Sequence, residues 1–370
     1  MARCAPTTIP TALTPCSLEF CPAHPRLAVC GFYQTHQPPP AAAEDDAPPV
    51  ERIGSTLLFE AALDSSLAQI SYRPLQSFDC PAVLDARWTQ DPHQPLLISA
   101  DAQAGLNVYT LLDPLGPAPR LDRLHTFACS PREEGVLCLS LDISDKRNKS
   151  SSPSIVCSLS NGQVVLLAQP SQGPAALVET QRWNAHLYEP WTCAFDYWQP
   201  HSVFTGGDDC KLKLWDTRNT LDQPVLVNSK FDGGVTAIRS HHLREHMVAV
   251  GSYDARLRIF DQRKMTAAVQ EEACGGGIWR IKWAETDASR VLLAAMHAGF
   301  RVLEIAELPR GAPGPSLPAP VVSQLTHRAG LAYGADWGPS CPAPSAGSPH
   351  RSVVAGCSFY DRALHLWVVD

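Results

Sequence analysis

One unit of strand-forming runs and a tight turn recurs along this 370-residue chain, and it constrains the fold more than any other feature. The unit is clearest at Glu189 to Arg218, "EPWTCAFDYWQPHSVFTGGDDCKLKLWDTR". Two short β-prone runs are followed by "GGDD", whose residues accept turn conformations, and then by "KLKLW", which alternates with period two. The unit therefore predicts a strand, a second strand, a tight turn and a third strand.

The same order returns downstream in "VTAIRSHHLREHMVAVGSYDARLRIFDQR" and again in "SFYDRALHLW". In all three copies the turn aspartate precedes the strand aromatic by six residues, as from Asp209 to Trp215. The last aromatic residue of the first strand is Tyr197 in one unit and Trp283 in a later unit, and Ser240 takes this place in the unit between them. The spacing is 43 residues from Tyr197 to Ser240 and again from Ser240 to Trp283. Self-similarity at a period near forty residues is typical of a propeller.

Weaker copies of the first strand cover the rest of the chain and bring the number of units to seven. They are "PCSLEF" (15–20), "VLDARW" (83–88), "CLSLDI" (138–143), "IWRIKW" (278–283) and "AYGADW" (332–337). We therefore expect an all-β fold, a seven-bladed β-propeller of the WD-repeat type. The last unit ends at "HLWVVD" with only three strands. Because Cys4 to Leu13 belongs to no unit, we expect this N-terminal segment to complete the last blade and close the ring.

Composition predicts where the propeller is interrupted. We expect one domain over residues 1–370, with a disordered Pro/Ala/acidic insertion at 34–50, "QTHQPPPAAAEDDAPPV". Two further Pro-rich loops are expected at 309–320 and 338–350.

Charge and cysteine content narrow the class of protein. A net charge of −7 without basic clusters argues against nucleic acid as a partner. No apolar run reaches the roughly twenty residues of a membrane span, so membrane insertion is not expected. The 13 cysteines, scattered and without a C-x-x-C pair, are typical of reduced, mostly buried thiols in a cytoplasmic protein. We expect no metal and no cofactor.

Three local patterns have both a chemical and a structural interpretation. His186, Thr205, Asp209 and Trp215 could form a catalytic relay, but a structural network that ties the inter-blade loop to the turn is the stronger interpretation. The pair His242 and His246 has the spacing of a helical zinc pair, yet it falls in a connection between strands. The "GGG" at 275–277 could cradle phosphate, but no helix and no Lys-Ser/Thr follow it.

In a propeller the loops that lead into the first strands and the turns between second and third strands share one face, here called the upper face. Aromatic and acidic residues are expected to gather there, among them Glu189, Trp191, Asp208, Tyr253 and Trp279. A group of aromatics around the mouth of a channel indicates a site for an apolar or cationic group.

Several motifs resemble one family. "EPWTCAFDYWQPHSVFTGGDD", "LWDTR", "GSYD", "GGGIWRIKW", "MHAGF", "YGADW" and "CSFYDRALHLW" are similar to the WD-repeat family of diphthamide biosynthesis, named diphthine methyltransferase and understood as a diphthine methyl ester hydrolase. The resemblance is strong from His186 to Phe300 and from Tyr333 to Trp367, and it is only architectural over the first 180 residues.

The resemblance implies a hydrolase that demethylates diphthine methyl ester on the modified histidine of elongation factor 2. Other proteins of the diphthamide pathway are further expected partners. The substrate group carries a trimethylammonium beside the ester carbonyl, and aromatic faces and carboxylates are suited to holding such a cation.

The resemblance supplies motifs but no catalytic roles, so the roles come from chemistry. Ester hydrolysis needs an activated water or a nucleophile. We expect His297 to activate water, with Asp208 or Glu189 orienting it or pairing with the ammonium, and Ser358 to be the nucleophile if a covalent intermediate forms. The residues expected to bind substrate are Glu189, Trp191, Ser252, Tyr253, Trp279, Tyr333 and Tyr360.

A second class of function stays open. Most WD-repeat propellers bind proteins and carry out no chemistry, so the alternative is a non-catalytic scaffold for protein assembly or endosomal trafficking. Loss of the methyl ester from elongation factor 2 would distinguish the two.

Overall fold

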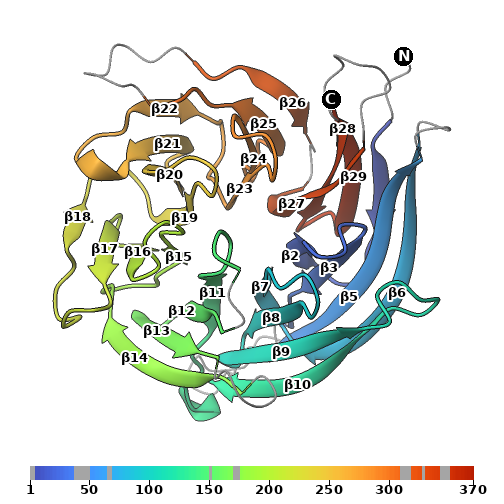
Figure 1. Cartoon of the computed structure of the whole chain (residues 1–370), viewed down its shortest axis with the longest axis horizontal. Coiled ribbons are helices and arrows are strands. Elements are labelled where there is room, and N and C mark those ends of the chain that lie inside the picture. The colour runs from blue at the N-terminus through green and yellow to red at the C-terminus, as the bar shows by residue number, and fades with distance from the viewer. Residues whose placement is uncertain are drawn as a thin grey trace, which may run out of the picture.

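The computed structural model describes residues 5–36, 51–64, 69–149, 152–169, 176–308, 318–326, 330–341 and 351–370. These residues form seven antiparallel sheets that follow one another around a common axis (Figure 1). Two 3-10 turns, Arg132–Glu134 and Gln262–Lys264, are the helical elements of the described ranges. No helix within those ranges has the length and apolar character to span a membrane. The predicted seven-bladed β-propeller is confirmed.

The innermost strand of each blade lies next to the axis and contacts the innermost strands of both neighbouring blades. In chain order these strands are β2 (Pro15–Phe20), β7 (Val83–Trp88), β11 (Cys138–Ile143), β15 (Thr192–Phe195), β19 (Val235–Ser240), β23 (Arg280–Trp283) and β27 (Ala332–Cys341). The second strands are β3 (Leu27–Phe32), β8 (Leu96–Asp101), β12 (Ser154–Leu159), β16 (Ser202–Gly206), β20 (Met247–Ser252), β24 (Arg290–Ala294) and β28 (Arg351–Ser358). Three innermost strands coincide with "PCSLEF", "VLDARW" and "CLSLDI", because each of these runs has apolar residues suited to a strand buried on both faces.

The third and fourth strands lie progressively farther from the axis. The third strands are β5 (Glu51–Asp64), β9 (Gly105–Leu112), β13 (Gln163–Ala168), β17 (Leu212–Asp216), β21 (Arg256–Asp261), β25 (Phe300–Glu304) and β29 (Ala363–Val369). The fourth are β6 (Gln69–Pro81), β10 (Arg120–Ala128), β14 (Val178–Asn184), β18 (Leu226–Asn228), β22 (Gln270–Ala273), β26 (Val321–Leu325) and, in the last blade, β1 (Thr7–Pro10).

Two of the expected loops begin later than the composition indicated. Gln34–His36 form strand β4, which pairs with the start of the long strand β5, so these three residues are not part of a disordered insertion. Residues 338–341 extend β27, where Ser340 pairs with Ser352. In both places a long partner strand offers backbone hydrogen-bonding groups that outweigh local turn preferences. The remainders, 37–50 and 342–350, lie outside the described residues, as does 309–317.

The ring is closed by the N-terminal segment, as expected. Thr7 to Pro10 pair with Leu366 to Ala363, so β1 becomes the outer strand of the blade made by β27, β28 and β29. Thr8 Oγ1 also lies 3.1 Å from His365 Nδ1. The two chain ends consequently meet in one sheet (Figure 1).

Deletion of Met1 to Pro10 should therefore destabilise the protein and promote aggregation. It removes all four residues of β1 and leaves the backbone groups of β29 without their partners, which exposes an unpaired sheet edge. Thermal unfolding and light scattering measure the two effects. A truncated chain that unfolds at the same temperature as the full chain and stays monomeric would contradict this account of closure.

A tryptophan in the lower half of an innermost strand ties adjacent blades together. In three blades its indole N–H donates to a backbone carbonyl of the preceding blade: Trp88 to Glu19 (3.4 Å), Trp283 to Arg239 (3.3 Å) and Trp337 to Lys282 (2.9 Å). The aromatic body fills the space between blades and the polar atom of the indole is satisfied.

The strand pairing corrects one register. Trp283 pairs with Val291, the second residue of the next strand. In the two preceding blades the residues that pair in the same way are Ser240, with Val248, and Phe195, with Val203. Phe195 and not Tyr197 is therefore the counterpart of Ser240, and β15 ends two residues before Tyr197. The spacing of 43 residues is therefore correct from Ser240 to Trp283 but not for the unit before. The error arose because the units were aligned by their last aromatic residue and not by strand pairing.

Candidate functional site

The turns between second and third strands place four of the predicted site residues in equivalent positions. Each turn contains a residue with positive φ: Cys210 (57°), Ala255 (63°), Gly299 (79°) and Arg362 (49°). Two residues before it stand, in successive blades, Asp208, Tyr253, His297 and Tyr360. All four are exposed. The repeat of the fold thus sets one carboxylate, one imidazole and two phenols along an arc of the upper face.

Aromatic side chains form a continuous group beside this arc, here called the upper aromatic cluster: Trp191, Tyr253, Trp279, Tyr333 and Phe359. Trp191 lies 6.2 Å from Tyr253 and 6.0 Å from Trp279, measured between ring centroids. Tyr333 joins the cluster at 4.8 Å from both Trp279 and Phe359. The members come from four consecutive blades, so the structure brings together residues far apart in sequence.

Asp208 lies against this cluster. Its Oδ1 accepts a hydrogen bond from Trp191 Nε1 at 3.0 Å. Burial, together with the charge of Asp208, raises the pKa of Tyr253 to about 12. Gly234 is needed at this point, because a Cβ there would lie 2.8 Å from Asp208 Oδ1 and 3.3 Å from Tyr253 Cδ2. Aromatic faces and a carboxylate therefore meet in one place, the combination that attracts a quaternary ammonium.

His297 lies on the same face, in the turn that follows β24. The residue before it, Met296, has φ of +40°, an uncommon backbone conformation for a residue other than glycine. Met296 is held there by the Ala332 N–H, which donates to its carbonyl at 3.1 Å. Its Sδ would lie 3.0 Å from a Cβ at Gly277, which shows how closely this turn approaches the loop before Trp279. His297 itself is exposed to solvent.

The other predicted site residues are less accessible. Ser358 is fully buried, and its Oγ has no hydrogen-bond partner among the described residues. Ser252 is also fully buried; its Oγ donates to the Gly233 carbonyl at 2.8 Å and accepts from the Asp254 N–H. Glu189 is half-buried, and its carbonyl accepts from the Asp208 N–H at 2.9 Å. Ser252 thus forms part of a turn, and Glu189 helps to fix the turn that carries Asp208.

His186, Thr205, Asp209 and Trp215 form one chain of hydrogen bonds. His186 Nδ1 lies 2.8 Å from Asp209 Oδ1 and its Nε2 lies 2.8 Å from Thr205 Oγ1, which also accepts from Trp215 Nε1 at 2.9 Å. Burial lowers the pKa of His186 despite the carboxylate beside it. The chain joins an inter-blade loop, a turn and the third strand.

Replacement of Asp209 by Ala should lower stability more than activity. It leaves the buried His186 ring without its acceptor, at a cost of about 1 to 3 kcal/mol of unfolding free energy. Denaturant unfolding and turnover of the same variant separate the two effects. Unchanged stability with abolished turnover would assign the four residues to catalysis.

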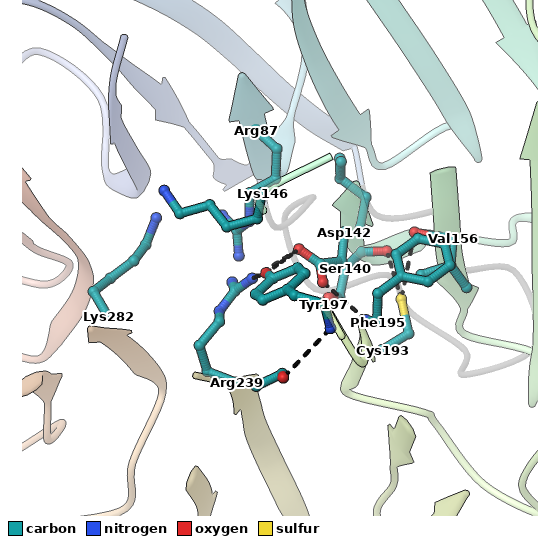
Figure 2. Close-up of polar contacts among 12 residues, drawn as sticks. Arg87, Ser140, Asp142, Lys146, Val156, Cys193, Phe195, Tyr197, Arg239 and Lys282 are labelled. Carbon is teal, nitrogen blue, oxygen red and sulfur yellow. Dashed lines mark hydrogen bonds and ion pairs between the residues drawn. The ribbon is translucent and has the colours of Figure 1, made fainter. Parts of the chain in front are cut away.

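A second polar site lies at the opposite end of the axis, around a cavity of about 550 Å³. Six of the seven innermost strands carry a charged residue immediately before the position that Trp88, Trp283 and Trp337 take in their own strands. These residues are here called the charged ring: Glu19, Arg87, Asp142, Arg239, Lys282 and Asp336. The seventh strand has Ala194 there, and the hydroxyl of Tyr197 occupies the gap by donating to Asp142 Oδ1 at 3.0 Å. Figure 2 shows Arg87, Arg239 and Lys282 reaching toward the same region from different blades.

Ion pairs link members of the charged ring in two groups. Glu19 Oε2 lies 2.9 Å from Arg87 Nη1 and 2.7 Å from Lys282 Nζ, and Asp142 Oδ1 lies 2.7 Å from Arg239 Nη1. At the rim of the cavity, Lys146 Nζ pairs with Glu285 at 2.6 Å. Burial raises the pKa of Asp145, which also lines the cavity, to about 6.

One level above the charged ring, a pair of residues from distant blades meets across the axis. Arg280 Nη2 donates to Asp85 Oδ1 at 3.1 Å, and Asp85 also accepts from Arg87 at 2.8 Å. The Asp85 side chain is fully buried. Burial alone would raise the pKa of Asp85, but the guanidinium groups of Arg280 and Arg87 hold it below its usual value. Because Arg280 directly follows Trp279, this pair lies beneath the upper aromatic cluster and separates it from the lower cavity.

Sequence reasoning missed the charged ring, although a signal was present. The fragments "LEF", "ARW", "LDI", "IRS", "IKW" and "ADW" each carry a charge at the same place in an otherwise apolar strand. A charge at a buried strand position is costly unless it is paired. Its recurrence in six units therefore indicates that the charges face one another.

The remaining candidate patterns are integrated into loops and core. His242 Nε2 contacts the Glu285 carbonyl at 3.3 Å, whereas His246 lies beside Glu245, so the two histidines do not converge. In the triple glycine, a Cβ at Gly276 would lie 2.3 Å from the Ala295 carbonyl, so close backbone packing explains it. The sulfurs of Cys129, Cys138 and Cys157 lie within 4.8 Å of one another, inside the apolar core between two blades.

Known proteins resemble this chain over most of its length. No family model matches it. The diphthine methyltransferase of Mus musculus is 33% identical over 336 residues, which is 89% of this chain and 68% of the relative. The diphthine methyltransferase homolog of Dictyostelium discoideum is 29% identical over 374 residues and 95% of each chain. A chain in the crystal structure of the mitotic checkpoint complex has the same fold, with a TM-score of 0.65 at 13% identity, covering 100% of this chain and 96% of that one. Identity of this extent to a curated relative, on the propeller described above, shows that the chain belongs to the diphthine methyltransferase family.

Proposed function

We propose that this protein is a carboxyl methyl ester hydrolase that demethylates diphthine methyl ester on elongation factor 2 during diphthamide biosynthesis. The observation that carries the proposal is the upper aromatic cluster with Asp208 hydrogen-bonded at its edge. A group that is permanently cationic and has no N–H to donate is best held by aromatic faces and a nearby carboxylate. The names of the relatives support the choice of diphthine as the modified residue.

In this proposal His297 is the general base. It removes a proton from a water molecule as the water oxygen attacks the ester carbonyl carbon. The tetrahedral intermediate then collapses, the bond to the methoxy oxygen breaks, and the proton held by His297 goes to that oxygen, which leaves as methanol. The products are methanol and the carboxyl group of diphthine, which loses the second proton of the water to solvent and becomes a carboxylate. The exposed imidazole of His297 is open to water, whereas the buried Ser358 hydroxyl is not, which favours direct attack by water over a covalent intermediate.

Trp191→Ala should raise KM and leave kcat nearly unchanged. The ammonium keeps its charge throughout the reaction, so the groups that hold it stabilise the bound substrate and the transition state alike. Loss of one cation–π contact costs about 0.5 to 2 kcal/mol, equivalent to a roughly 2- to 30-fold rise in KM. Trp191→Phe keeps an aromatic face and should retain most of the affinity. An effect of Trp191→Ala on kcat alone would remove this residue from cation binding.

Mass spectrometry of elongation factor 2 carrying diphthine methyl ester tests the proposed reaction. Incubation with the purified protein should replace the ester methyl group by hydrogen, release methanol and leave the trimethylammonium intact. Spontaneous hydrolysis is measured in parallel without the protein. If the mass stays unchanged while an unrelated esterase or mild base removes the methyl group, the protein is not this hydrolase, and the scaffold alternative is favoured.

A further inference from the structure

We propose that the inter-blade loop beside the upper aromatic cluster is a docking surface for a basic, partly apolar loop of the protein substrate that carries the modified histidine. The surface consists of Leu187 and Tyr188 with the carboxylates of Asp208 and Asp232. This inference rests on the proposed function, because it assigns the protein part of the same substrate to a place next to the site.

Leu187 and Tyr188 are unusually exposed for their type. The relative exposure of Leu187 is 83% and that of Tyr188 is 62%. They lie between β14 and β15, in the loop that runs from the outer edge of one blade to the innermost strand of the next. Two adjacent large side chains in water leave apolar surface that a bound partner would cover.

The loop that presents these side chains is held at both ends. His186 N donates to the Gly162 carbonyl at 3.1 Å, and the His186 ring is fixed by Asp209 and Thr205. At the other end, the Glu189 carbonyl accepts from Asp208 N at 2.9 Å. The backbone is thus ordered before any partner arrives, which reduces the entropy lost on binding.

The position of the loop connects docking to the site. Trp191, whose indole donates to Asp208, is the fourth residue after Leu187. A protein segment seated on Leu187 and Tyr188 would therefore extend directly toward the upper aromatic cluster. The cluster can hold a small cationic group, and the adjacent surface can hold the polypeptide on which that group is carried.

Charge indicates the kind of segment. Burial and the carboxylates of Asp208, Asp209, Asp254 and Asp232 raise the pKa of the Cys210 thiol, so acidic groups converge here. Asp209 is engaged by His186, and Asp254 pairs with Arg258 at 2.8 Å. Asp208 and Asp232 remain exposed. Electrostatic complementarity therefore favours a basic partner.

The test is the double variant Leu187→Ser with Tyr188→Ser, assayed on elongation factor 2 carrying diphthine methyl ester and on a free trimethylammonium amino acid methyl ester. We expect about a tenfold rise in Kd and KM for the protein, an unchanged kcat at saturation, and unchanged kinetics on the small ester. The matched control is Leu115→Ser, which changes a 90% exposed leucine in the connection between β9 and β10 and should alter neither.

An unchanged Kd for elongation factor 2 in the double variant overturns the docking surface, even if hydrolysis proceeds normally. A loss of kcat on both substrates also overturns it, since the two residues would then act on the reaction itself. If the wild-type protein hydrolyses neither ester, the proposed function fails. The docking surface is then judged by Kd alone, with a tenfold loss supporting it and an unchanged value rejecting it.

Discussion

His297→Ala is expected to lower kcat for diphthine methyl ester hydrolysis by about a hundredfold or more while leaving KM nearly unchanged. A general base contributes only as the proton is transferred, so its loss raises the barrier without weakening the bound substrate. His297 shares its turn position with Asp208, Tyr253 and Tyr360, which places it on the arc beside the proposed ammonium site. Steady-state kinetics with elongation factor 2 as substrate measure both parameters.

His93→Ala is the matched control, because His93 is also exposed but lies in the connection between β7 and β8. It should retain wild-type turnover. Wild-type kcat in His297→Ala at saturating substrate would mean that another group activates water, and Glu189 and Asp208 would be the next residues to replace.

Asp85→Ala is expected to lower the free energy of unfolding by about 3 to 5 kcal/mol, because it leaves buried guanidinium groups without their counter-charge. Asp85 accepts from Arg280 and Arg87, and its Oδ2 also accepts from the Leu141 N–H at 3.2 Å. One carboxylate therefore connects three blades. Equilibrium unfolding in denaturant measures the loss.

The control for this loss is Asp122→Ala. Asp122 is 54% exposed and lies 3.8 Å from Arg120, and exposed pairs of this kind contribute little. Asp85→Leu combined with Arg280→Met should recover part of the stability, since a buried ion pair can be replaced by apolar residues of similar size. Equal stabilities for Asp85→Ala and Asp122→Ala would show that the buried network does not hold the blades together.

The blade pattern was predictable because it depends on local rules. Alternation in "KLKLW", the turn residues "GGDD" and their recurrence define strands and turns without reference to the rest of the molecule. Closure of the ring followed from counting strands. The last unit had only three strands, and the N-terminal segment belonged to no unit, so it could supply the fourth. The exact bounds did not follow, as residues 34–36 and 338–341 show, because pairing with a long neighbouring strand decided them.

Most members of the upper aromatic cluster could be predicted from the sequence, but their contacts with one another could not. Topology placed Trp191, Tyr253, Trp279 and Tyr333 on one face, while the bond from Trp191 to Asp208 depends on two side-chain conformations. Phe359, which stacks on Tyr333, was not among the residues expected to bind substrate. Ser252 and Ser358 were expected to face the substrate, yet both are fully buried. The sequence does not show how deeply a residue at the end of a strand lies beneath the adjoining turn.

The pairing of β1 with β29 has a consequence for biosynthesis. Thr7 pairs with Leu366, so β1 has no partner during synthesis until β29 has been made. At roughly 5 to 20 residues per second, about 20 to 70 seconds separate their translation. Throughout that interval the nascent chain can stack blades in order but cannot lock them into a circle. The circular architecture thus forms only once β29 has been synthesised, in a late step that joins two strands lying far apart in the sequence.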